Sequence, residues 1–194
     1  MEVKLIRYPT EEDWLLVKQC AFATIGKDTN VPPDAEWKHK ILRARHSPIR
    51  ELRFVFRIEG IPSWVATHLA RHHVGVQPYI QSQRNDRQKK YDRNAARQDA
   101  PVAMIISFNG ESIQTFANKR LCGTTAEETR AVARQMCRLV LSYEPAYTGL
   151  LVPNCVRQGG ICHEMKPCRR KEQNHVDTRG KKGIAQEALQ PEGN

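Results

Sequence analysis

A chain of 194 residues, 40% hydrophobic and 27% charged, is long enough for one domain with its own core and has the composition of a globular protein. No apolar run approaches the roughly 18 residues of a membrane span, and the first residues lack the apolar stretch of a signal peptide, so we expect a cytoplasmic protein that does not contact a membrane. The formal net charge of +10 calls for an anionic partner, and a nucleic acid, a nucleotide, a dinucleotide cofactor or a polyglutamylated folate fits it equally well.

The N-terminal segment predicts a strand followed by two helices. Alternation that begins at Val3 indicates a short strand. Thr10 stands before three acidic residues, which is typical of a capped helix start, and the predicted helix runs to about residue 23. After a loop over 24–33, Asp34 opens a second helix that ends near residue 45.

The clearest strand is 52–58, where apolar residues alternate with arginines. We expect Gly60 to Pro62 to turn the chain and Ser63 to cap a helix over 64–73. Residues 74–100 are polar and without a period, so they predict a long loop, and loops of this length are usually functional or disordered.

Helical spacing returns over 110–121 and again over 125–143, where Thr125 and Glu128 predict a capping box and Pro145 follows the helix end. These elements predict an α+β fold with helices flanking an antiparallel sheet. We expect a single domain over 1–165 and a polar, mobile C-terminal tail over 166–194.

Three cationic residues share one face of the predicted helix 64–73. His68, Arg71 and His72 are spaced by three and four residues. Two interpretations fit this stripe: a solvated helix end, where cations are favoured, or a surface that binds an anion. The segment 76–87, which brings amides, a hydroxyl and two arginines into one loop, favours a nucleotide site, because arginine holds phosphate through two hydrogen bonds.

At this point the sequence resembles the flavin-dependent thymidylate synthases. That family has the order His with Ser/Thr-Pro, then Arg-His-Arg, a spacer and Ser-x-Arg, then Asn-x-Arg and Glu-x-Arg on successive helices. This chain carries the motifs in the same order: His46-Ser47-Pro48, Arg71-His72-His73, Ser82-Gln83-Arg84, Asn118-Lys119-Arg120 and Glu128-Thr129-Arg130. It departs from the family at His73, which replaces an arginine, in a longer spacer, in a shorter middle, and at the apolar segment 102–106, which lacks a nucleotide-binding arginine.

The resemblance implies a role for each matching residue. FAD would contact Ser47, Arg71, His72, His73, Asn118 and Arg120. The substrate dUMP would contact His68, Arg71, Gln81, Ser82, Arg84 and Arg130, with Arg84 on the phosphate. Arg130 would be catalytic, near the uracil ring, and would favour ionisation at N3.

The family reaction implied by this resemblance is reductive methylation of dUMP to dTMP, with methylenetetrahydrofolate as the one-carbon donor and NADPH as the reductant of FAD. The protein orients the reactants and supplies charge, and no cysteine nucleophile is needed. Family members are homotetramers whose active sites combine several subunits, so the resemblance implies a homotetramer.

Three of the six cysteines and one histidine lie close together near the end, in the order Cys155, Cys162, His163, Cys168. Thiolates and imidazole are ligands of structural zinc, although the spacings are not those of CxxC pairs. The alternative is a set of reduced thiols in a segment that packs near the active site.

Two alternatives to the synthase remain at this point. One is a flavoprotein of the same fold with an altered nucleotide substrate, suggested by His73 and the short middle. The other is a basic nucleic-acid-binding protein that uses the arginines of 84–97, although the chain has no zinc-finger spacing, no paired RNA-stacking aromatics and no evident recognition helix. We expect no nucleic-acid partner.

Overall fold

The computed structural model describes residues 1–88, 92 and 94–168. The strands are β1 (Glu2–Arg7), β2 (Arg53–Pro62), β3 (Val76–Ile80) and β4 (Pro101–Asn109). The α-helices are α1 (Glu11–Ala23), α2 (Ala35–Ala44), α3 (Ser63–Ala70), α4 (Ser112–Arg120), α5 (Glu127–Tyr143) and α6 (Asn154–Arg157), and two 3₁₀ turns are η1 (Ser47–Glu51) and η2 (Pro145–Tyr147).

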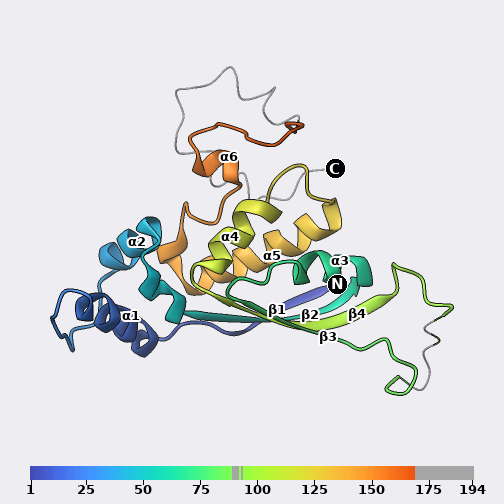
Figure 1. Cartoon of the computed structure of the whole chain (residues 1–194), viewed down its shortest axis with the longest axis horizontal. Helices are drawn as coiled ribbons and strands as arrows, with labels where there is room; N and C mark the ends of the chain where they lie inside the picture. Colours follow the sequence, from blue (N-terminus) through green and yellow to red (C-terminus); the bar gives the residue numbers. More distant parts are fainter. Residues whose placement is uncertain (89–91, 93, 169–194) are drawn as a thin grey trace.

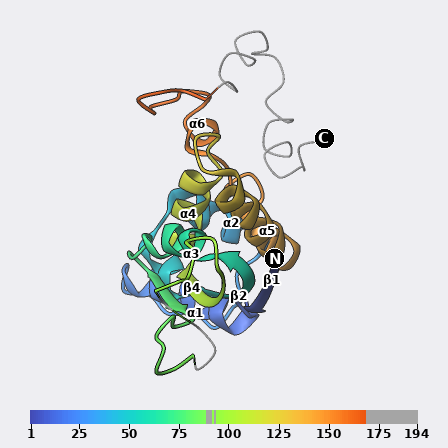
Figure 2. The same ribbon diagram turned by 90° about the vertical axis from the view of Figure 1, so that its right-hand side faces the viewer.

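The strands form one four-stranded antiparallel sheet in the order β1-β2-β4-β3. Helices α3, α4 and α5 lie along one side of the sheet, whereas α1 and α2 lie beyond one end of it (Figure 1). Turned by 90°, the molecule shows α6 standing beyond α4, away from the sheet (Figure 2). The predicted α+β class, with helices flanking an antiparallel sheet, is confirmed.

The predicted starts of the first two helices are confirmed by their caps. The backbone N–H of Asp13 donates to Thr10 Oγ1 at 3.2 Å, and the Thr10 N–H donates back to the Asp13 carboxylate at 2.9 Å. The Asp34 carboxylate accepts from the Trp37 N–H at 2.8 Å. Each side chain satisfies a donor that the first helical turn leaves without an intrahelical partner.

Strand β2 shows the predicted alternation, because Phe54, Phe56 and Ile58 are fully buried whereas Arg53 and Arg57 are exposed. The predicted turn at Gly60 to Pro62 is wrong. The strand continues through Pro62, and its register against β4 shifts between Ile58 and Ile61. Gly60, at φ +67°, allows this bulge because it has no Cβ.

Two helix boundaries differ from the prediction. Ser63 is the first residue of α3 and makes no capping hydrogen bond, and α3 ends at Ala70, so the residues after it lie just beyond the helix. The predicted capping box at Thr125 is also wrong. The Thr125 hydroxyl donates to the Lys119 carbonyl instead, and α5 begins at Glu127 without a side-chain cap.

The predicted loop over 74–100 contains β3, and the apolar residues after it form β4, which the sequence analysis did not predict. Val102, Met104, Ile106 and Phe108 on β4 are buried against the helices. Hydrogen bonding to β2 on one edge and β3 on the other makes β4 central. The first part of the β3–β4 connection, residues 81–88, extends beyond the end of the sheet (Figure 1).

Helix α5 attaches the helical layer to the sheet. Val132, Met136 and Val140 are fully buried on this helix, and Leu139 beside them is half-buried. No helix in the described residues has both the length and the apolar character needed to cross a membrane. The predicted tail over 166–194 lies, apart from its first three residues, outside the described residues.

Candidate functional site

The end of α3 and the end of α4 are joined by the side chain of Arg120. Its Nε donates to Nε2 of His72 at 2.8 Å, and its Nη2 donates to the backbone carbonyl of His68 at 2.7 Å. Carbonyls in the last turn of a helix lack intrahelical partners and carry partial negative charge, so Arg120 satisfies the C-terminal end of α3. We call His68, Arg71, His72 and Arg120 the His–Arg cluster.

His72 is held as a neutral imidazole. Burial, with further contributions from the charges of Arg120, His73 and Lys119, lowers its pKa from 6.5 to about 4. Its ring lies edge-on to Phe116, with centroids 5.2 Å apart. Because Nε2 accepts from Arg120, the ring proton of the neutral form is on Nδ1, which is therefore a donor.

His68 lies one turn earlier and faces α5. Its Nδ1 is 3.1 Å from Oγ1 of the buried Thr129, and its ring lies edge-on to Trp64. Burial and the charges of Arg120 and Arg71 lower the pKa of His68 as well. Both histidines therefore contribute hydrogen-bonding groups, whereas the arginines supply the charge.

Within the described residues, no carboxylate neutralises the positive charge of the cluster. Arg71 is exposed, and neither Arg71 nor Arg120 forms an ion pair with a carboxylate of the described residues. Burial and Arg71 lower the pKa of Arg120, although a guanidinium remains charged. His73 is exposed, and its Nδ1 is 3.1 Å from the Arg71 carbonyl. Such a group attracts an anionic ligand.

Arg130 lies in the first turns of α5, where Glu127 holds it. The Glu127 carboxylate accepts from Nη2 of Arg130 and, at 2.6 Å, from Nη2 of Arg134. Nη1 of Arg130 also donates to the Gly123 carbonyl at 3.3 Å. This predicted catalytic residue is thus fixed between the α4–α5 connection and its own helix.

The predicted dUMP-binding residues Gln81, Ser82 and Arg84 lie together at the start of the β3–β4 loop. The Gln81 side chain accepts from the Ala103 N–H at 3.0 Å, which ties the loop to β4. Ser82 Oγ accepts from the Arg84 N–H at 3.3 Å. The Arg84 guanidinium donates to both carboxylate oxygens of Asp86, at 2.9 and 2.7 Å. A fork that binds a carboxylate in this way also fits a phosphate.

Within one chain, the structure does not bring this loop to the His–Arg cluster. Within the described residues, the hydrogen bonds of the Gln81, Ser82 and Arg84 side chains go to Ala103, Arg84 and Asp86 and not to the cluster. The loop projects from the end of the sheet (Figure 1).

Two further predicted flavin contacts are Ser47, on η1, and Asn118, on α4. Ser47 is exposed at the start of η1. The Asn118 amide is buried; its Nδ2 donates to the Val152 carbonyl at 2.7 Å, and its Oδ1 accepts from Arg45. Sequence reasoning did not select Arg45, whose φ of 53° ends α2 in a left-handed conformation that no spacing rule identifies.

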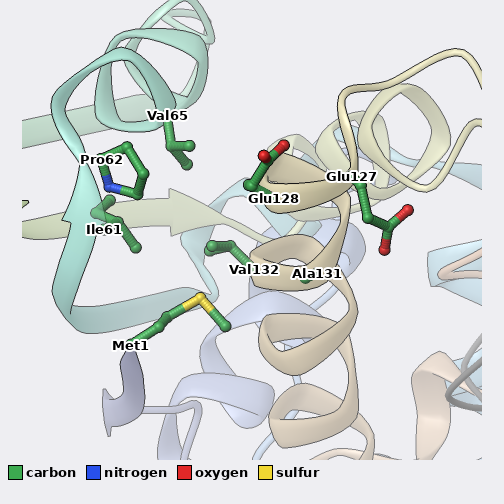
Figure 3. A pocket seen from close by; sticks show the side chains of 8 residues that line it. All are labelled: Met1, Ile61, Pro62, Val65, Glu127, Glu128, Ala131 and Val132. Carbon is green, nitrogen blue, oxygen red and sulfur yellow. The ribbon is translucent and has the colours of Figure 1, made fainter. Parts of the chain in front are cut away.

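An apolar pocket of about 350 Å³ lies between the β2–α3 junction and the N-terminal end of α5 (Figure 3). Glu128 is on the α3 side of α5, across from Val65, whereas the Glu127 side chain extends to the other side of that helix (Figure 3). The pocket is lined by Met1, Ile61, Pro62, Val65, Glu127, Glu128, Ala131 and Val132. The sequence analysis did not predict it, because it combines residues from three separate segments.

The proposed metal ligands Cys155, Cys162, His163 and Cys168 lie on and after α6. In the part of the chain that the structure describes, no three His, Cys, Asp or Glu side chains already surround one point closely enough to hold a metal ion. His163 is exposed, whereas the three thiols are half-buried.

The sequence matches no family model and no curated protein. Solved structures do match. A UMP/dUMP methylase, PolB from Streptomyces cacaoi, bound with 5-Br dUMP, superposes with a TM-score of 0.60 at 16% identity, over 78% of this chain and 96% of that one. Thymidylate synthase X (ThyX) from Helicobacter pylori, with FAD and dUMP, superposes with a TM-score of 0.61 at 15% identity, over 80% of this chain and 99% of that one.

The chain has the ThyX fold. The match confirms the fold implied by the sequence resemblance, and it spans nearly the whole of both neighbouring chains. At 15–16% identity the likeness establishes the arrangement of helices and strands, and it leaves the role of each residue to the chemistry of the site.

Proposed function

We propose that the protein is a flavin-dependent thymidylate synthase that converts dUMP to dTMP. The observation that carries this proposal is the His–Arg cluster, a positive group that no carboxylate of the described residues neutralises, on a ThyX fold and at the positions where the sequence resembles the flavin signature. In this proposal methylenetetrahydrofolate supplies the one-carbon unit, NADPH is the reductant, and a homotetramer assembles the sites.

The described residues fit FAD. Arg71 and Arg120 supply positive charge for the pyrophosphate, and His72 supplies an N–H donor at Nδ1. Bound FAD supplies the hydride chemistry that none of these side chains can perform. The contribution of the protein is a rigid donor array, because Arg120 fixes both the His72 ring and the end of α3.

For dUMP, the proposal gives the phosphate to Arg84. The Arg84 guanidinium is paired with Asp86, and a phosphate dianion would replace that carboxylate in the same two hydrogen bonds. Arg130, fixed by Glu127, would lie near the uracil ring and stabilise negative charge at N3. Because the loop with Arg84 projects away from the His–Arg cluster of its own chain, we propose that it completes the site of a neighbouring subunit.

The nucleotide itself needs a direct test, since one structural neighbour is a UMP/dUMP methylase. The alternative function is therefore a flavoprotein of this fold with an altered pyrimidine nucleotide. Comparison of dUMP with UMP as the methyl acceptor distinguishes the two, because the substrate with the higher kcat/KM identifies the base and sugar that the site recognises.

The first experiment is the absorption spectrum of the purified protein, followed by anaerobic NADPH oxidation with and without dUMP. We expect a flavin band, faster oxidation with dUMP, and folate-dependent formation of dTMP. A colourless protein that does not take up added FAD would overturn the proposal, and a steep salt dependence of binding to oligonucleotides would then support the nucleic-acid alternative.

The loop offers a matched pair of variants for the phosphate contact. Arg84 pairs with Asp86, and Arg97 pairs in the same way with Asp99, two residues later. We expect Arg84→Ala to raise the KM for dUMP about 100-fold, because two charge-assisted hydrogen bonds are lost. Arg97→Ala should leave that KM unchanged, and equal effects of the two variants would contradict the assignment of Arg84.

A further inference from the structure

Four of the six cysteines converge from three separate segments of the chain. Cys122 lies two residues after the end of α4, Cys155 is on α6, and Cys162 and Cys168 lie on the segment after α6. A Cβ added to Gly123 would lie 2.9 Å from Sγ of Cys168, so this thiol rests against the residue next to Cys122. Cys122 and Cys168 are therefore neighbours in space although 46 positions (168 minus 122) separate them.

Cys155 belongs to the same group. Burial is the main cause that raises the pKa of its thiol, and the charges of Cys122, Cys162 and Cys168 contribute in the same direction. A Coulombic effect of this kind requires the groups to be near one another. The other two cysteines lie elsewhere: Cys20 is on α1, and Cys137 is fully buried in the core stripe of α5.

Apolar packing does not explain what holds the segment after α6. Ile161 is 58% exposed and Met165 is fully exposed, at 101%. Gly159 and Gly160 have positive φ, and the residues after them form neither helix nor strand up to residue 168. Within 159–168, the side chains that are partly buried are those of Cys162 and Cys168. Short segments that lack a core are commonly fixed by a structural metal or by disulfides.

We propose that Cys122, Cys155, Cys162 and Cys168 bind one Zn²⁺ ion as a structural tetrathiolate site. Four thiolates in a tetrahedron are the usual donor set of structural zinc. This ligand set differs from the one that the sequence offered as a possibility, because Cys122 takes the place of the exposed His163. It does not depend on the proposed function.

The thiols have to turn towards one another to bind the ion, since no three metal-binding side chains in the described residues already surround one point. With Zn–S bonds of about 2.3 Å, the sulfurs of a tetrahedral site lie about 3.8 Å apart. The Cys122 thiol lies 3.2 Å from Oγ1 of Thr124. Rotation about χ1 exchanges that weak hydrogen bond for a metal bond. Four thiolates and one Zn²⁺ carry a net charge of −2, which the nearby guanidinium of Arg130 and the net charge of +10 favour.

Zinc at this position would join the segment after α6 to the α4–α5 connection. That connection includes Gly123, whose carbonyl accepts from Arg130. The ion is therefore structural, and it fixes the backbone from which Arg130 is positioned.

The test is metal analysis of the full chain, purified under reducing conditions without added chelator. We expect about one zinc per chain. Replacement of zinc by Co²⁺ should give the visible bands of tetrahedral cobalt with thiolate charge transfer. Cys122→Ser should lose most of the metal, whereas Cys20→Ser, which alters a half-buried thiol outside the group, should retain it.

Cys162→Ser provides a second variant that leaves the core untouched, because this residue lies in the irregular segment. We expect it to lose zinc and to become sensitive to limited proteolysis after α6 while the circular dichroism of the helices is unchanged. A wild-type chain that contains no zinc, binds no Co²⁺ and exposes these four thiols to a thiol reagent in the native state would overturn the proposal. A Cys122–Cys168 disulfide that persists in protein purified under reducing conditions would also overturn the proposal.

Discussion

The neutral state of His72 predicts how the stability of the protein depends on pH. Its pKa is about 4 in the folded chain and 6.5 as the ordinary value, chiefly because of burial and then because of Arg120. Between these pH values the unfolded chain binds a proton that the folded chain does not. The contribution of His72 to the free energy of unfolding is therefore complete above pH 6.5 and is lost as the pH falls towards 4. The whole shift corresponds to about 3 kcal/mol, and partial exposure of the ring reduces the expected effect to about 1–2 kcal/mol.

The perturbation that isolates this effect is His72→Gln, since a glutamine oxygen still accepts from Arg120 but does not titrate. Urea unfolding at fixed protein concentration, at about pH 5 and about pH 7.5, measures the pH-dependent loss of stability in both proteins. We expect the variant to lose about 1 kcal/mol less than the wild type over this range. His46→Gln, at an exposed histidine, should behave as the wild type. Equal pH dependence in the His72→Gln variant and the wild type would refute the argument that burial keeps this ring neutral.

Three further substitutions test the packing and the cluster. Gly110→Ala should lower the free energy of unfolding by about 2–3 kcal/mol, because the added Cβ would lie 2.4 Å from a backbone oxygen of η1; chemical denaturation measures it, and a neutral result would contradict this packing. Trp14→Phe should cost about 1–3 kcal/mol in the same assay, because it removes the 2.9 Å hydrogen bond to the buried carboxylate of Glu144. Arg120→Met should weaken FAD retention at least tenfold in equilibrium dialysis, whereas Lys119→Met, at its exposed neighbour, should not; equal retention would remove Arg120 from the flavin site.

The N-terminal helices and β2 could be predicted because their signals are local. The cap of α1 lies within four residues, and the alternation of β2 lies within seven. Strand β4 escaped prediction because it is buried in the middle of the sheet, and a continuous apolar run does not show the alternation of a half-exposed strand. The turn expected at Gly60 became a bulge because pairing with β4 continues past it, which is tertiary information.

Some residues of the candidate site could also be predicted from local signals, whereas others could not. His68 and His72 were selected from helical spacing, and the structure shows that the His68 backbone carbonyl and the His72 ring both accept hydrogen bonds from Arg120. The pairing of Asn118 with Arg45, and the place of Cys122 among the distant thiols, depend on how α2, α4 and α6 pack. Pairs so far apart in sequence, or joined through a loop, leave no periodic pattern in one sequence.

The position of β4 in the sheet has a consequence for the order in which the molecule is made. Strand β2 needs β4 on one edge, and β4 is the last strand to leave the ribosome. Until about residue 109 has emerged, the nascent chain presents an open strand edge beside the apolar row of Phe54, Phe56 and Ile58, and α5 is not yet available to cover it. Unpaired edges and uncovered apolar faces promote association with other chains, so the interval between synthesis of β2 and α5 is the period when this protein most needs chaperone protection.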